Sequence, residues 1–156
     1  LRSSAQGDAQ QAARANARVA LMLAIGDLQK QLGPDTRISA TADLIGGPTS
    51  TVPQARRNWA GAYKSWPAAV PSAPRPEPEF LQWFVSGDPT KSNSKDFATA
   101  VQSGTAVDIV TEKTVGPNGD TVKVPLMTQK LTNGTKNNFA WWVSDLGTKA
   151  LVSTAK

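Results

Sequence analysis

The segment ARVALMLAIGDLQKQLGPD (residues 17–35) decides how the chain begins to fold. Its apolar residues recur at steps of three and four, which places them on one face of an α-helix. They are Ala17, Leu21, Ala24 or Ile25, Leu28 and Leu32. Gly33 and Pro34 then give a stop signal, because Gly can adopt the left-handed cap conformation and Pro cannot continue a helix.

The same helical composition extends toward the N-terminus. Good helix formers dominate from about Ser4, so we expect one helix that ends at Leu32, within a helical unit of residues 1–33. Its first half is rich in Ala, Gln and Ser and its second half in Leu, Met and Ile. We therefore expect the second half to pack on a domain and the first half to project from it. The residues expected at the packing contact are Leu21, Ile25, Leu28 and Leu32.

The remaining residues, 34–156, are expected to form a head of mixed structure. Its first part alternates as a strand does, and it then becomes irregular and rich in Pro and Trp, with a linker near residues 67–78. Two short helices are expected after the linker, and Ser94 is a candidate cap of the second. The expected segments are a strand within 36–45, an irregular middle from 46 to 78, and helices within 77–88 and 94–104.

The last third of the chain has the texture of an antiparallel sheet. Two runs rich in β-branched residues, 105–115 and 121–131, flank the sequence GPNGD, in which Asn118 and Gly119 are a strong hairpin signal. Residues 137–156 are expected to form a further hairpin that bends at 145–147. A long helix followed by an antiparallel sheet is an α+β plan.

Composition excludes several kinds of chemistry. The chain has no Cys and no His, so it cannot build a Cys/His zinc site or a Ser–His or Cys–His dyad. Its 12 acidic residues show no metal-loop spacing. We therefore expect that the protein is not an enzyme and that it binds no cofactor and no metal. The printed chain has no apolar run of 18 or more residues.

A net charge of +5 and five Trp residues leave a binding role open. Cations and aromatic rings are the ingredients of single-strand nucleic-acid binding, and they alternate in RRNWAGAYKSWP (residues 56–67). The same residues also suit a loop that is packed by its aromatic side chains. The alternative to a structural role is thus a secreted module that binds an anionic polymer, either nucleic acid or glycan. Its candidate contacts are Arg56, Arg57, Trp59, Lys64 and Trp66.

Most of the Trp residues are expected to be core anchors, because Trp buries a large apolar body. Trp141 and Trp142 are neighbours in an expected strand, so their side chains should point to opposite faces. One of the two is expected to be buried. The other is a candidate contact between subunits or a residue covered by another part of the chain.

Four segments of the chain resemble type IV pilins and pseudopilins, and in particular the PilX-like Verru_Chthon cassette protein A group. The most specific is LRSSAQGDAQQAARANARVALMLAIGDLQKQLGPDTRISATADLI (residues 1–45). The others are NWAGAY (58–63), FLQWFVSG (80–87) and FAWWVSDLGTKALV (139–152), in the same order as in the family. Together they cover roughly half of the chain.

The resemblance implies a structural subunit of a type IV pilus or pseudopilus in the cell envelope. The helix would be the C-terminal half of a pilin spine helix, on the side of the globular head. An apolar segment of about twenty residues would precede it and anchor it in the inner membrane before assembly. The cleavage Gly and the Glu at mature position five, hallmarks of the class, are not in this chain, and members of the family are usually longer. Partners would be copies of the chain or other pilin-like subunits, and Arg14 and Arg18 would pair with acids of neighbouring subunits.

Overall fold

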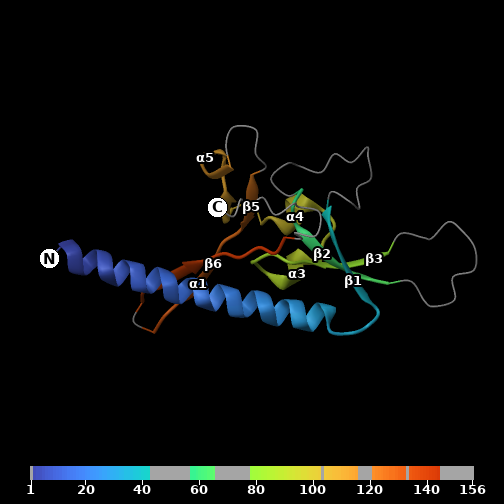
Figure 1. Cartoon of the computed structure of the whole chain (residues 1–156), viewed down its shortest axis with the longest axis horizontal. Coiled ribbons are helices and arrows are strands. Elements are labelled where there is room, and N and C mark those ends of the chain that lie inside the picture. Colours follow the sequence, from blue (N-terminus) through green and yellow to red (C-terminus); the bar gives the residue numbers. More distant parts are fainter. Residues whose placement is uncertain are drawn as a thin grey trace, which may run out of the picture.

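The computed structural model describes residues 2–42, 57–65, 78–102, 104–115, 121–132 and 134–144. Within them the chain is α+β: a long N-terminal helix, α1 (Arg2–Leu32), lies along a head of antiparallel strands and short helices (Figure 1). The predicted linker near 67–78 and the predicted bend at 145–147 lie almost wholly outside these residues.

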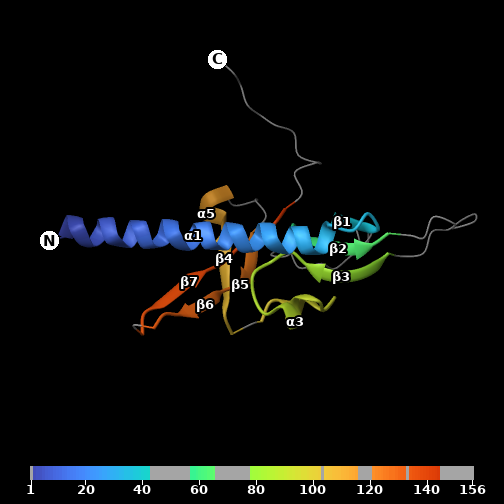
Figure 2. The same ribbon diagram turned by 90° about the horizontal axis from the view of Figure 1, so that it is seen from below.

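Helix α1 ends where the sequence predicts. The Gly33 N–H donates to the carbonyl oxygen of Gln29 at 3.0 Å, and a Cβ on Gly33 would lie 2.7 Å from that oxygen. Glycine is therefore needed here for a close backbone approach, and not for the left-handed conformation that we expected, because Gly33 is not among the residues with positive φ. The N-terminal part of α1 projects beyond the head in both perpendicular views (Figures 1 and 2).

The sheet next to the C-terminal part of α1 has three strands in the order β1-β2-β3, all antiparallel. They are β1 (Arg37–Thr41), β2 (Ala60–Lys64) and β3 (Glu79–Trp83). The strand predicted within 36–45 is confirmed. The helix predicted within 77–88 is wrong, because this segment pairs with β2 as a strand. The middle of the chain is also not simply irregular, since β2 is the central strand of this sheet.

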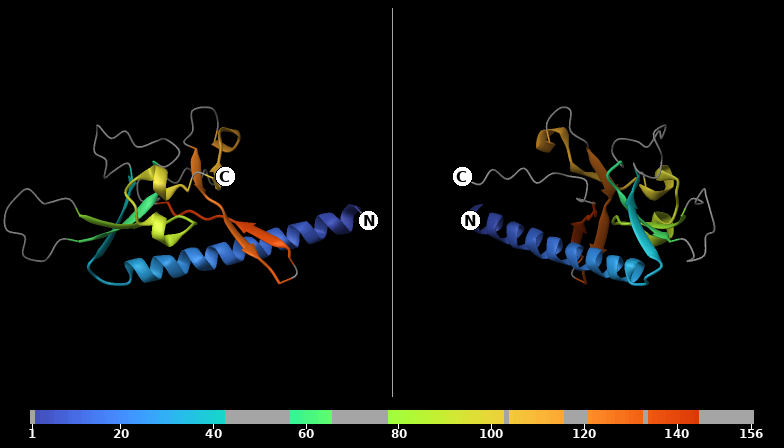
Figure 3. Two further views of the ribbon diagram at one scale, coloured as in Figure 1. Left: turned by 180° about the vertical axis from the view of Figure 1, so that it is seen from behind. Right: turned by 45° about the vertical axis from the view of Figure 1, so that its right-hand side comes forward.

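The described residues contain two further antiparallel pairs of strands. Strand β4 (Ala106–Val110) pairs with β5 (Val122–Pro125), as the Asn-Gly signal predicts, although the turn itself lies outside the described residues. The run 121–131 is two strands and not one, because it breaks at Leu126. Its second part, β6 (Met127–Lys130), pairs with β7 (Lys136–Phe139). This hairpin lies beside the middle of α1 (Figures 2 and 3).

Between the described strands lie three one-turn helices. The predicted second short helix exists as α4 (Phe97–Ala100), but its cap is Asp96, whose carboxylate accepts from the backbone N–H groups of Ala98 and Thr99. The Ser94 hydroxyl oxygen instead accepts from the backbone N–H of Asp96, the capping residue itself. The others are α3 (Pro89–Ser92) and α5 (Glu112–Val115).

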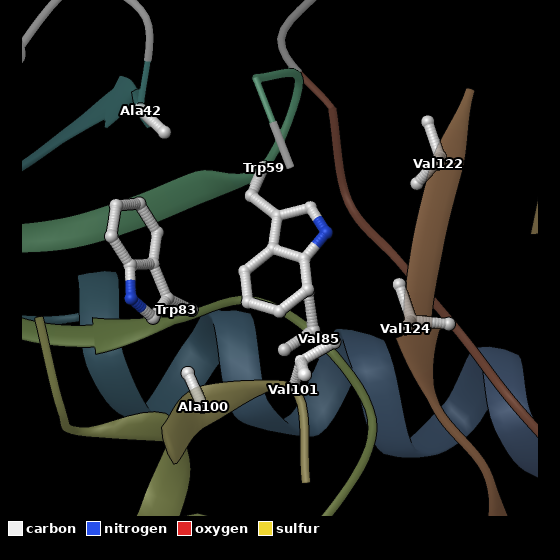
Figure 4. Packing of buried hydrophobic residues seen from close by; sticks show 8 residues of the cluster. All are labelled: Ala42, Trp59, Trp83, Val85, Ala100, Val101, Val122 and Val124. Carbon is white, nitrogen blue, oxygen red and sulfur yellow. The ribbon is translucent and has the colours of Figure 1, made fainter. Parts of the chain in front are cut away.

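The main core lies between the three-stranded sheet, α4 and β5. Trp59 is fully buried at its centre, with Trp83 on one side and Val122 and Val124 of β5 on the other (Figure 4). The Trp59 ring meets Trp83 edge-on at 6.1 Å between centroids. Aromatic and β-branched side chains thus fill the head, as expected for a chain without disulfides.

Candidate assembly surface

Helix α1 meets the head through small side chains in its middle and larger ones near its end. Ala20 and Ala24 are buried, which lets the helix backbone approach the head closely. Further along, Leu28 and Leu32 pack against a second core cluster formed by Ala60, Ala62 and Phe84. The second half of the helix is therefore attached to the head, and Figure 3 shows it lying against the sheet.

Two glutamines and one aspartate join the helix to β3 by hydrogen bonds. Gln31 Nε2 donates to Gln82 Oε1 at 2.9 Å, and Gln82 Nε2 donates to Asp27 Oδ2 at 2.8 Å. Partial burial raises the pKa of Asp27 above its ordinary value of 3.8, while the hydrogen bond from Gln82 and the charge of Lys30 act in the opposite direction. These two hydrogen bonds hold α1 at one rotation about its own axis.

We expect Asp27→Asn to change how stability depends on pH. Because the folded-state pKa of Asp27 is raised, its stabilising contribution is complete below 3.8 and is lost as pH rises through the raised value. Asn keeps an oxygen that can accept from Gln82 but carries no charge. The variant should therefore gain stability relative to the wild type as pH rises from about 3 to 7, as urea unfolding at several pH values would measure.

The control for this experiment is Asp108→Asn. Asp108 is an exposed carboxylate in β4, 3.7 Å from Lys123 Nζ and remote from α1. An Asp27→Asn difference that is the same at both ends of the pH range would contradict the assigned burial of Asp27.

The other sides of the helix carry exposed large apolar side chains. Among the described residues seven such side chains are exposed, and five of them lie between residues 19 and 25, the others being Ile109 and Leu131. Met22 is 74% exposed, Leu21 60% and Ile25 45%. An exposed apolar cluster of this kind is typical of a surface that contacts another protein.

The prediction for helix–head packing is therefore correct for only two of its four residues. Leu28 and Leu32 do lie against the head, whereas Leu21 and Ile25 face away from it, and the prediction is wrong for these two. All four lie on one line along the helix, but the sheet that this line meets covers only the last turns. Residues 19–25 form a continuous apolar run, VALMLAI, which is too long for one face. That run was the signal of an exposed apolar surface.

Arg14 and Arg18 continue this line toward the N-terminus, and both are exposed. Their spacing of four residues, followed by three to Leu21 and four to Ile25, keeps them on one side of α1. The predicted role of these arginines in assembly stays a prediction.

A groove runs between the opposite side of α1 and the head, with a cavity volume of about 320 Å³. Met22, Leu23 and Gly26 of the helix form one wall, and residues from three parts of the head, including Val85, Met127 and Trp141, form the other. Asp27 and Lys30 add charge at the helix side. No local sequence pattern indicates this groove, because it depends on how the helix crosses the head.

Trp141 and Trp142 point to opposite sides, as predicted for neighbours in an extended segment. Trp142 packs on the main core, and its Nε1 donates to the carbonyl oxygen of Asn58 at 3.0 Å. Trp141 packs against the second cluster and lines the groove. Both side chains are half-buried. The candidate contact between subunits is therefore Trp141, while Trp142 holds the loop before β2.

The structure describes only part of the aromatic and basic segment, which was the alternative binding face. Trp59 is fully buried, so the prediction that it contacts a ligand is wrong. Lys64 is exposed but pairs with Glu79 at 2.8 Å on the neighbouring strand. Arg57 is exposed and also engaged in an interaction. Arg56 and Trp66 lie outside the described residues, and their predicted roles remain untested.

Within the part of the chain that the structure describes, no group of three or more acidic residues could hold a metal ion. None of the described helices has the length and apolar character to cross a membrane. Protein-family models give no match to the chain, and comparisons with curated proteins and with solved structures give none either.

Proposed function

We propose that this chain is a structural subunit of a pilin-like assembly of the cell envelope, of the type IV pilus or pseudopilus kind. It would act by packing and not by catalysis, with copies of itself or related subunits as partners. Before assembly, an apolar segment upstream of residue 1 would hold it in the inner membrane.

One observation carries this proposal: the exposed apolar side chains between residues 19 and 25 gather on the sides of α1 that the head leaves uncovered. Burying a Leu or Ile side chain contributes about 1.5–3 kcal/mol, so several of them together can hold neighbouring copies. The attachment of the last helical turns through Leu28 and Leu32 supports it, because it presents the rest of the helix as a fixed surface.

The main test is self-association of the chain, measured by sedimentation over a range of concentrations. We expect the wild type to associate, and Leu21→Lys with Ile25→Lys to weaken association at least about tenfold, because two charges would enter an apolar contact. Ile109→Lys with Leu131→Lys is the matched control, since it places the same charges on exposed apolar positions of the head.

A wild-type chain that stays monomeric at all concentrations would overturn the assembly proposal, as would an equal effect of the control. Binding of the monomer to an oligonucleotide, with strong salt dependence, would then favour the module for anionic polymers. Whether the protein is a pilin is tested separately, by determining the native N-terminus of the full-length protein. We expect mass spectrometry of the membrane fraction to find a processed, N-methylated residue followed by about twenty apolar residues that lead into Leu1.

A further inference from the structure

Helix α1 carries two different surfaces on its free sides. The first is the α1 ridge, formed by the exposed side chains of Arg14, Arg18, Leu21 and Ile25. The second is the α1 groove, the cavity between the helix and the head that Leu23 and Gly26 line on the helix side. Each residue turns the helix by about 100°, so Leu23 points about 200° away from both Leu21 and Ile25. The ridge and the groove therefore lie on nearly opposite sides of α1.

The groove has the size and lining of a receptor for aliphatic side chains. Its volume is about 320 Å³, whereas an apolar cavity of roughly 150 Å³ is enough to hold a benzene ring. Met22 and Leu23 are exposed at its rim, and Val85, Met127 and Trp141 contribute the wall on the head. Two branched aliphatic side chains one helical turn apart, as in Leu21 and Ile25, match this volume.

We propose that the α1 groove of one copy receives the α1 ridge of a second copy of this chain. This inference rests on the proposed function and specifies its contact. Because donor and receptor surfaces are different, a copy whose ridge is bound still offers its own groove to the next. Such a heterologous contact does not close by itself and extends into an open array.

The ridge brings two positive charges to a groove that carries one charge of each sign. Two arginines precede the apolar pair of the ridge, and Asp27 and Lys30 both line the groove. Asp27 is only half-exposed, and within its own helix its cation is Lys30, on the next turn. An arginine side chain brought by a second copy would face this carboxylate at the edge of the groove, where partial burial weakens screening by solvent.

The inference is tested by mixing two defective variants. The ridge variant is Leu21→Lys with Ile25→Lys, and the groove variant is Leu23→Lys with Gly26→Lys. All four positions are exposed and helical, and a Cβ on Gly26 would meet no atom within 4 Å, so both variants should keep the wild-type circular dichroism spectrum, and both gain the same charge. We expect each alone to associate at least about tenfold more weakly than the wild type. A one-to-one mixture should form a dimer that grows no further, because it retains one intact ridge and one intact groove.

The outcomes distinguish a failure of the ridge–groove contact from a failure of the proposed assembly function. If the wild type associates and the ridge variant does not, but the groove variant associates like the wild type, this inference fails and the proposed function stands. A wild type that stops at a dimer, or a mixture that forms no dimer, also overturns the heterologous contact. If the wild type does not associate at all, the proposed function itself fails.

A second measurement places the contact directly. The chain has no cysteine, so Ile25→Cys in one copy and Met127→Cys in another introduce a single thiol each. Oxidation of the mixture should give a crosslinked heterodimer in at least about tenfold higher yield than a mixture of Ile25→Cys with Thr114→Cys. Thr114 is exposed on α5, away from the helix. Equal yields in the two mixtures would contradict the proposal.

Discussion

Replacement of Trp59 by Ala should remove about 3–5 kcal/mol from the free energy of unfolding, the usual cost of truncating a large buried aromatic side chain. Trp59 is fully buried, and its ring lies 6.1 Å from that of Trp83 and 6.0 Å from that of Phe97. Its Nε1 also donates to the carbonyl oxygen of Lys123, which joins the three-stranded sheet to β5. The loss is a large part of the roughly 5–15 kcal/mol that stabilises a typical domain.

Urea unfolding would measure this loss as a midpoint lower by about 1–3 M, given usual denaturant slopes. Trp142→Phe is the control, because it keeps a ring in a half-buried position while it removes the hydrogen bond to Asn58 and part of the ring's packing on the main core. That change should cost about 1 kcal/mol. A Trp59→Ala variant within 1 kcal/mol of the wild type would show that the ring is not the centre of the core.

Gly87→Ala should destabilise the head by about 2–4 kcal/mol, because it combines backbone strain with overpacking. Gly87 has a φ of +120°, which side chains of L-residues rarely adopt. A Cβ at this position would lie 2.6 Å from Gln102 Nε2 and 2.8 Å from the Cβ of Pro125. Pro125 belongs to β5 and cannot move without disturbing the main core.

The matched control is Gly134→Ala in the loop between β6 and β7. Gly134 also has a positive φ, +79°, but a Cβ there would meet no atom within 4 Å. It should cost only the strain of the backbone, about 1 kcal/mol. Urea unfolding of both variants separates the two effects. Equal losses would show that Pro125 and Gln102 yield freely to the added methyl group.

Local signals predicted the parts of the fold that local chemistry controls. The helix ends at Leu32, followed by Gly33, where a side chain would clash with the Gln29 carbonyl, and by Pro34, which cannot continue a helix. Strand β4 pairs with β5 across an Asn-Gly turn signal. For the segment from Glu79 to Trp83 the local pattern predicts a helix, whereas the structure has the strand β3. Its apolar residues suit either structure, and pairing with β2, which is distant in sequence, decides the matter.

The surfaces of α1 were harder to predict for the same reason. Heptad-like spacing identifies the line that contains Leu21, Ile25, Leu28 and Leu32, but it does not tell where along that line the head ends. Nor could the sequence place Asp27 beside Gln82, since the two residues are 55 positions apart. Burial of Trp59 depends in the same way on β5 and α4, which come much later in the chain.

The indole groups of the head also have a consequence for how fast it folds. Trp59 donates to a carbonyl 64 positions away in sequence, and Trp142 to one 84 positions away. Long loops must close before these contacts can form, and the entropy of closure is lost before their stabilisation is gained. Proteins dominated by such non-local contacts fold in milliseconds to seconds. Helix α1 forms through contacts between neighbouring residues. We therefore expect it to pack on the head only after the slower contacts of the head have formed.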